Sequence, residues 1–112
     1  MFDPHRQTLM QIEARSAKEA VASQMVKNDD ILDILRSRIN HQAPTAVITC
    51  ARGSSDHAAT YLRYILQTHL GLLSTSLSPS VSSLYGQWPH VPGALCVAIS
   101  QSGASDDLLS VV

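Results

Sequence analysis

The sequence predicts an α/β fold in which a parallel sheet with its helices follows an N-terminal helical arm. Two apolar runs, 46–51 and 94–99, have the length and composition of strands buried in a sheet. Each runs directly into a turn rich in serine and glycine, and each turn is followed by a segment that suits a helix. Strands that alternate with helices in this way form parallel sheets.

The arm comprises residues 1–43 and is predicted to hold two consecutive helices. Asp3 and Pro4 suit an N-cap followed by proline at the first helical position. The run 28–30, Asn-Asp-Asp, interrupts the helical pattern and starts a second helix, which Pro44 closes. Each helix has one apolar face, made of Met10, Ala14, Ala17, Val21 and Met25 in the first and of Ile31, Leu35 and Ile39 in the second.

Residues 44–112 are predicted to form the first portion of an α/β domain. The strand at 46–51 ends in a turn at Gly53, and a long helix follows that stops at Gly71. Apolar residues recur at helical spacing along this helix, so one face is expected to pack inward. Its predicted inward residues are Ala58, Leu62, Ile65, Leu66 and Leu70.

Further along the chain, a second strand is expected within 72–77 and a short helical or irregular piece through Tyr85. The strand at 94–99 then leads to a helix start at Ala104. Three strands make a small sheet with an open edge. We therefore expect the chain to be a truncated part of a larger domain, with only the first part of that domain present.

The charges of the chain are balanced. At 112 residues it is one domain at most, with 8 Lys and Arg against 9 Asp and Glu. This balance lacks the basic footprint of a protein that binds nucleic acid or an anionic membrane. No apolar run is long enough to span a bilayer, so we expect a soluble cytoplasmic protein. Cys50 and Cys96 lie in apolar runs without metal-ligand spacing, which favours buried reduced thiols over a disulfide or a metal site.

The middle of the chain is free of charge, because no Asp, Glu, Lys or Arg lies between Gly71 and Ser105. A stretch of this composition is expected to be covered by other structure, either the chain's own helices or a partner subunit. Together with the helical arm, it predicts a homodimer or a higher homo-oligomer.

Two hydroxyl-rich loops follow the predicted strands, Gly53-Ser54-Ser55 after the first and 100–105, Ser-Gln-Ser-Gly-Ala-Ser, after the last. Backbone N–H groups at a helix start carry partial positive charge, and glycine lets the backbone approach a ligand closely. Loops at the carboxyl ends of adjacent parallel strands would converge on one anion, most naturally a phosphomonoester. Serine and aspartate at helix starts are also ordinary caps, and this alternative stays open. The spacings do not suit a serine nucleophile elbow, a nucleoside-triphosphate loop or a dinucleotide loop.

The segments 50–59, CARGSSDHAA, and 99–108, ISQSGASDDL, resemble the two phosphate-loop signatures of the SIS (sugar isomerase) domain family. The nearest relatives implied are the isomerase half of glutamine–fructose-6-phosphate aminotransferase and the SIS-type glucosamine-6-phosphate deaminases. This resemblance implies a three-layer, doubly wound, flavodoxin-like sheet and a sugar-phosphate ligand bound without metal or organic cofactor. It also implies that Gly53 and Ser54 shape the first loop, and that the 6-phosphate is held by Ser55, Ser100, Gln101, Ser102 and Ser105.

The resemblance has two departures. Ala104-Ser105 stands where the aminotransferases carry Glu-Thr, and Arg52 replaces a small residue. Both departures lean toward the deaminase-like branch or toward stand-alone proteins that resemble the aminotransferase. In the family the catalytic Glu, His and Lys lie downstream of the second loop, so we expect them beyond Val112. The chain's only glutamates, Glu13 and Glu19, belong to the predicted arm and are expected to be solvated.

Several roles stay open. His57 is either a ring-opening acid or a structural histidine, and Arg52 either adds charge to the phosphate site or lies on the surface. Trp88 is expected to be a packing anchor. The parent protein is predicted to be an isomerase, deaminase or aminotransferase-type enzyme acting on glucosamine 6-phosphate or fructose 6-phosphate. A non-catalytic SIS regulator that senses a sugar phosphate is the alternative, although residues 1–40 lack its basic helix-turn-helix.

Overall fold

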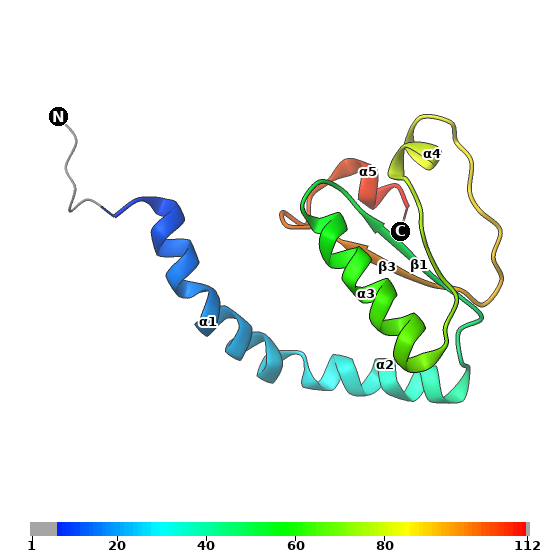
Figure 1. Ribbon diagram of the computed structural model, residues 1–112, viewed down its shortest axis with the longest axis horizontal. Coiled ribbons are helices and arrows are strands. Elements are labelled where there is room, and N and C mark those ends of the chain that lie inside the picture. Colours follow the sequence, from blue (N-terminus) through cyan, green and yellow to red (C-terminus); the bar gives the residue numbers. More distant parts are fainter. Residues whose placement is uncertain (1–6, 112) are drawn as a thin grey trace. The chain divides into compact units, whose positions relative to one another are not determined.

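The computed structural model describes residues 7–111, which divide into one compact unit that ends at Gln42 and another that begins at Ala43 (Figure 1). The first unit contains α1 (Leu9–Lys27) and α2 (Asp29–His41). The chain breaks between them at Asn28, as predicted, and the N–H of Asn28 donates to the carbonyl of Gln24 at 3.0 Å. Neither helix contains a buried residue.

The start of α1 differs from the prediction. Asp3 and Pro4 lie outside the described residues, and the helix begins at Leu9 with Thr8 as its N-cap. The N–H of Gln11 donates to Thr8 Oγ1 at 3.3 Å, and the N–H of Thr8 donates to Gln11 Oε1 at 3.0 Å. This reciprocal capping box satisfies two backbone donors at once.

The second unit is an α/β domain portion with three parallel strands, β1 (Val47–Ala51), β2 (Ser74–Ser76) and β3 (Leu95–Ile99). Their order is β2-β1-β3, so the first strand in the chain is the central one. Val47 pairs with Ser74 on one side and with Leu95 on the other. The predicted parallel sheet is confirmed.

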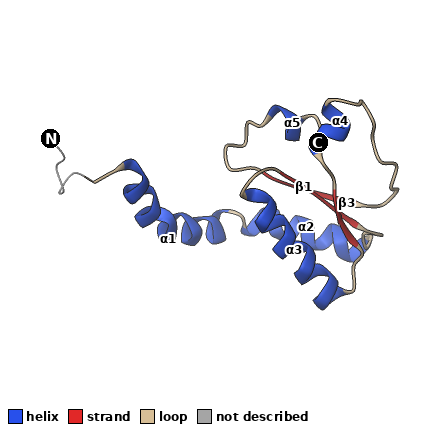
Figure 2. Cartoon of the chain, turned by 45° about the horizontal axis from the view of Figure 1, so that its top comes forward, coloured by secondary structure: helices blue, strands red, loops and turns tan. Residues whose placement is uncertain are grey.

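Helices cover both sides of this sheet. Figure 2 shows α3 (Ser55–Leu70) on one side and α4 (Pro79–Ser83) with α5 (Asp106–Leu109) on the other. The predicted three-layer, doubly wound arrangement is therefore present over the part of the domain that the chain spans. The long helix ends as expected at Gly71, whose φ of 62° is the left-handed conformation that glycine adopts without strain.

The core gathers around the central strand. Val47, Thr49 and Cys50 are 0% exposed, as expected for a strand covered on both faces. The edge strand β3 alternates between half-buried and exposed residues, so Cys96 is exposed and the prediction of two buried thiols is wrong for it.

Four further predictions are wrong, three about packing and one about the start of a helix. Ala59 is fully buried under the sheet where Ala58 had been expected, and Leu70 is exposed at the end of its helix. Trp88 is 55% exposed in the loop between α4 and β3, so it is no packing anchor within this unit. The helix predicted to start at Ala104 begins at Asp106, with Ser105 as N-cap. Among the described helices, none combines the length and the apolar character needed to cross a membrane.

Candidate functional site

The topology creates a crevice at the carboxyl ends of β1 and β3. These two strands are neighbours, yet the helices that follow them, α3 and α5, lie on opposite sides of the sheet. The loops that lead to the helices therefore leave the sheet edge in opposite directions, and open α/β sheets bind ligands at such a switch point.

A hollow of about 290 Å³ occupies this place. Both hydroxyl-rich loops contribute to its wall, and all seven residues that the sequence proposed for phosphate binding lie there. The lining residues are Arg52, Gly53, Ser54, Ser55, Ile99, Ser100, Gln101, Ser102, Ser105 and Leu108. The sequence analysis did not single out Ile99 or Leu108. Leu108 is buried and follows Ser105 by three residues, a helical spacing that indicates a shared face.

The first loop is a tight turn at the start of α3. Gly53 has a φ of 57°, and the N–H of Ser55 donates back to the carbonyl of Arg52 at 3.2 Å. The N–H groups of Asp56 and His57 make equivalent bonds to the carbonyls of Gly53 and Ser54. Within the described part of the chain, the N–H groups of Gly53 and Ser54 donate to no backbone or side-chain acceptor. Two backbone donors at the edge of the hollow are therefore available.

The second loop is braced by its own side chains. Ser100 Oγ accepts from the N–H of Gly103 at 3.1 Å and lies 3.3 Å from Ser105 Oγ. Ser102 Oγ accepts from the N–H of Ala104 at 3.2 Å. These bonds fix three serine side chains in one short turn, so their hydroxyl groups are held close together before any ligand arrives.

The capping alternative can be compared directly with this geometry. Ser54 and Ser105 occupy the N-cap positions of α3 and α5, where serine usually accepts a bond from the helix. Neither side chain makes such a bond. The hydroxyl of Ser105 contacts Ser100 instead. Capping thus does not explain the two serines at the helix starts.

The charge around the hollow suits an anion. Among the lining residues that the structure describes, Arg52 is the one whose side chain is charged at neutral pH, and none of them is a carboxylate. His57 is exposed and is not a lining residue, so the structure does not place it in the hollow.

Burial raises the pKa of the Cys50 thiol, Cys96 raises it further, and the charge of Arg52 lowers it. The buried thiol therefore stays protonated at neutral pH and is a poor nucleophile.

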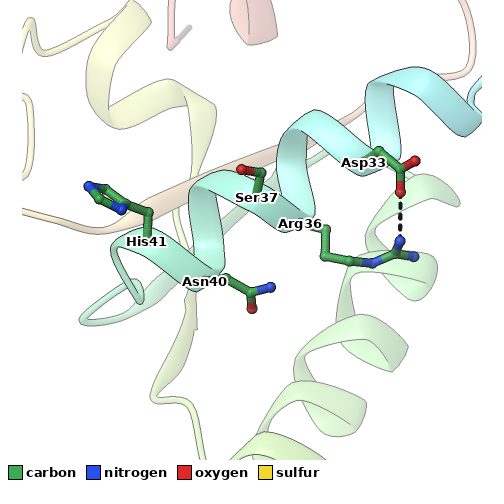
Figure 3. Close-up of a pocket in the computed structure, with 5 residues that line it drawn as sticks. All are labelled: Asp33, Arg36, Ser37, Asn40 and His41. Atoms are coloured by element: carbon green, nitrogen blue, oxygen red, sulfur yellow. Dashed lines mark hydrogen bonds and ion pairs between the residues drawn. The ribbon is translucent and has the colours of Figure 1, made fainter.

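A second hollow, of about 500 Å³, lies on α2 and is lined by Asp33, Arg36, Ser37, Asn40 and His41. Figure 3 shows these side chains projecting from one helix in different directions, linked only by the exposed pair Asp33–Arg36 at 2.6 Å. A binding site needs polar groups that converge. This surface has the character of a solvated helix face.

One polar network near the first loop was not predicted from the sequence. Arg63 of α3 donates to Thr49 of β1 at 2.6 Å and lies 4.0 Å from a carboxylate oxygen of Asp56. The signal was present as polar residues four and three apart, Asp56, Thr60 and Arg63, on a helix face that the predicted inward residues do not include.

Comparison with known proteins agrees with the fold. A chain described as a "putative phosphosugar isomerase" from Silicibacter pomeroyi DSS-3 matches 85% of this chain at 39% sequence identity, with a TM-score of 0.79. This chain spans 29% of the length of that structure. No model of a protein family matches the chain, and no curated protein sequence matches it.

The second unit is thus part of an α/β domain with the phosphosugar isomerase fold. The resemblance to SIS domains, which the serine loops predicted, is confirmed by this match.

Proposed function

We propose that the hollow between the two loops binds the phosphate group of a sugar phosphate. The observation that carries this proposal is the convergence of Gly53-Ser54-Ser55 and the loop 100–105 on one hollow beside a helix N-terminus. A phosphate dianion accepts hydrogen bonds through several oxygens and is stabilised by N–H groups, hydroxyls and a nearby cation. The residues proposed to hold it are Gly53, Ser54, Ser55, Ser100, Gln101, Ser102 and Ser105.

The donors fit a phosphomonoester in number and placement. The free N–H groups of Gly53 and Ser54 stand on one side, and the hydroxyls of the second loop stand on the other. Arg52 contributes one positive charge from the wall. A volume of about 290 Å³ has room for a phosphate and part of a hexose.

For the whole protein we propose an aldose–ketose isomerase or deaminase that acts on glucosamine 6-phosphate or fructose 6-phosphate. The phosphosugar isomerase neighbour supports an isomerase-type enzyme, and the substrate is part of the proposal. Moving a proton between C1 and C2 requires a base near the sugar. Glu13 and Glu19 are exposed on α1, so the proposal places the proton transfer on residues outside this chain.

A second candidate is a sugar-phosphate sensor without catalysis. It is favoured by the lining of the hollow, which holds phosphate-binding groups and no Glu, His or Lys among the described residues. Turnover separates the two candidates, because a sensor binds the sugar phosphate and leaves it unchanged.

We also propose a cytoplasmic homodimer or higher homo-oligomer. Support comes from α1 and α2, on which large apolar side chains are exposed, among them Met10, Val21, Met25, Ile31 and Ile34. Light scattering over a range of concentrations tests this proposal, and a monomer at every concentration would contradict it.

Calorimetry tests the proposed ligand. We expect glucosamine 6-phosphate to bind the chain and unphosphorylated glucosamine to bind far more weakly. Ser55→Ala and Ser102→Ala each remove one hydroxyl from the hollow and are expected to lower the affinity about tenfold or more. Ser37→Ala removes an exposed hydroxyl from α2 and is the matched control. Equal affinities of all four proteins would reject the phosphate site.

A further inference from the structure

A polar stripe runs along α3 from the first loop toward the middle of the helix. It consists of Asp56, Thr60 and Arg63, which are spaced so that they share one face. Thr60 Oγ1 donates to the carbonyl of Asp56 at 2.9 Å and accepts from Arg63 Nη2 at 2.9 Å. The guanidinium is thereby connected to the first turn of the helix, next to Ser55.

The same guanidinium connects this turn to the centre of the sheet. Arg63 Nη1 donates to Thr49 Oγ1 at 2.6 Å, and Thr49 is fully buried in β1. Thr49 in turn donates to the carbonyl of Thr75 at 3.3 Å. One side chain therefore ties the start of α3 to the strand that leads into the first loop.

Asp56 directly follows Ser55 and is the negative charge next to the first loop, as Asp106 directly follows Ser105 in the second. The Oδ1 atom of Asp56 is buried and accepts no hydrogen bond within the described residues, and its charged neighbour is Arg63 at 4.0 Å. The Arg63 side chain is 18% exposed and that of Asp56 48% exposed, so this pair is less screened than a surface pair.

We propose that Arg63 is a positioning residue for the anion site. It balances the carboxylate of Asp56, which would otherwise repel a phosphate at the start of α3, and it holds that turn against β1. This inference rests on the proposed function, because it assumes that the hollow between the loops binds phosphate.

The charge effect has a calculable size. A carboxylate and a phosphate dianion repel each other in water at a separation of roughly 8 Å, taken here as the order of magnitude for two groups at the same end of a helix. With screening, the repulsion corresponds to about a fourfold loss of affinity at 10 mM salt and about a twofold loss at 0.15 M. The effect of an unbalanced Asp56 should therefore shrink as salt is added.

A double-mutant cycle isolates this effect. Calorimetry at both salt concentrations uses glucosamine 6-phosphate and, separately, inorganic phosphate as the probes. Arg63→Met is expected to lower the affinity about fourfold at 10 mM salt, and Asp56→Asn is expected to raise it by a similar factor. The double variant Arg63→Met/Asp56→Asn is expected to bind more tightly than Arg63→Met, although both lack the same hydrogen bonds to Thr49 and Thr60. Salt dependence makes the test specific: loss of a charge role weakens binding more at 10 mM than at 0.15 M salt, whereas loss of a purely structural role would weaken it equally at both.

Stability provides a separate readout. Asp56→Asn removes a carboxylate from the first turn of α3 and should lower the midpoint of thermal unfolding while the affinity rises. If Arg63→Met does not fold, Asp56→Asn and Arg63→Lys keep the test open, and the lysine variant is expected to bind within about twofold of the unmodified chain. The matched controls are Arg36→Met and Asp33→Asn, which disrupt the exposed pair on α2.

The outcomes separate the two proposals. Equal affinity of Arg63→Met and its double variant, or unchanged or weaker binding by Asp56→Asn, would overturn the role of Arg63 and leave the phosphate site standing. An unmodified chain that binds neither probe would overturn both. Changes of the same size in the α2 control variants would also count against Arg63, because they would show a general charge effect.

Discussion

Gly53 and Gly71 stand at the two ends of α3 and offer a matched pair of perturbations. Both have a left-handed φ, 57° and 62°, and a Cβ built on either would meet nothing within 4 Å. Replacing either by alanine therefore adds no steric clash and leaves only backbone strain. An L-residue in this conformation costs about 1–2 kcal/mol, so the two variants should lose similar stability.

The measurable change follows from the size of the unit. For a domain of this size, each kcal/mol lowers the midpoint of thermal unfolding by roughly 4–8 °C. We expect Gly53→Ala and Gly71→Ala to shift the midpoint by the same amount within a few degrees. Calorimetric unfolding, or circular dichroism at rising temperature, measures it.

Ligand binding should separate the pair. Gly53 lines the hollow and presents one of its free N–H groups, whereas Gly71 lies at the opposite end of the helix. Gly53→Ala keeps this N–H but adds a methyl group at the wall of the hollow and strains the turn that presents the N–H, so it should weaken the binding of glucosamine 6-phosphate about tenfold or more, an effect of the size of one hydrogen bond to a charged group. Gly71→Ala should bind as the unmodified chain does. Equal affinities of the two variants, whether both weakened or both unchanged, would refute the assignment of Gly53 to the ligand site.

Three further predictions concern other parts of the chain. Ser105→Ala removes the hydroxyl 3.3 Å from Ser100 Oγ, so phosphate affinity should fall while the far-UV spectrum stays the same; an affinity equal to that of the unmodified chain would contradict the proposed role. Thr8→Ala breaks the capping box of α1 and should lower helix stability by about 1 kcal/mol, seen as reduced helicity by circular dichroism with phosphate binding unchanged. Burial raises the pKa of both thiols, but Cys96 is exposed and Cys50 is buried, so a maleimide should label Cys96 first and reach Cys50 only as the chain opens or unfolds. Mass spectrometry of peptides identifies the labelled residue, and labelling of Cys50 first would contradict this prediction.

The sequence predicted the parts of the structure that depend on local patterns. Val47–Ala51 is an apolar run interrupted only by Thr49, and such a run is explained by a central strand with cover on both faces. Gly71 ends a long helix because it adopts a left-handed φ. The meeting of the two serine loops followed from strand order alone, since adjacent parallel strands end at one edge.

Features that depend on tertiary context were not predictable in the same way. The exposure of Cys96 follows from the edge position of β3, which an apolar run does not reveal. The capping box at Thr8 was overlooked because Asp3-Pro4 matched a different start signal. The network around Arg63 needs the register of α3 on β1, since its partner Thr49 is fourteen residues away. Polar contacts between residues of different secondary-structure elements give only a weak pattern in the sequence.

The edge strand β3 is hydrogen-bonded on one side only, to β1, within the described residues. A ligand bound by both the turn after β1 and the turn after β3 would link the carboxyl ends of these two strands. Amide protons along 95–98, residues that do not line the hollow, would then exchange more slowly with solvent when the ligand is present. A bound small molecule would in this way stabilise the pairing of β3 with β1.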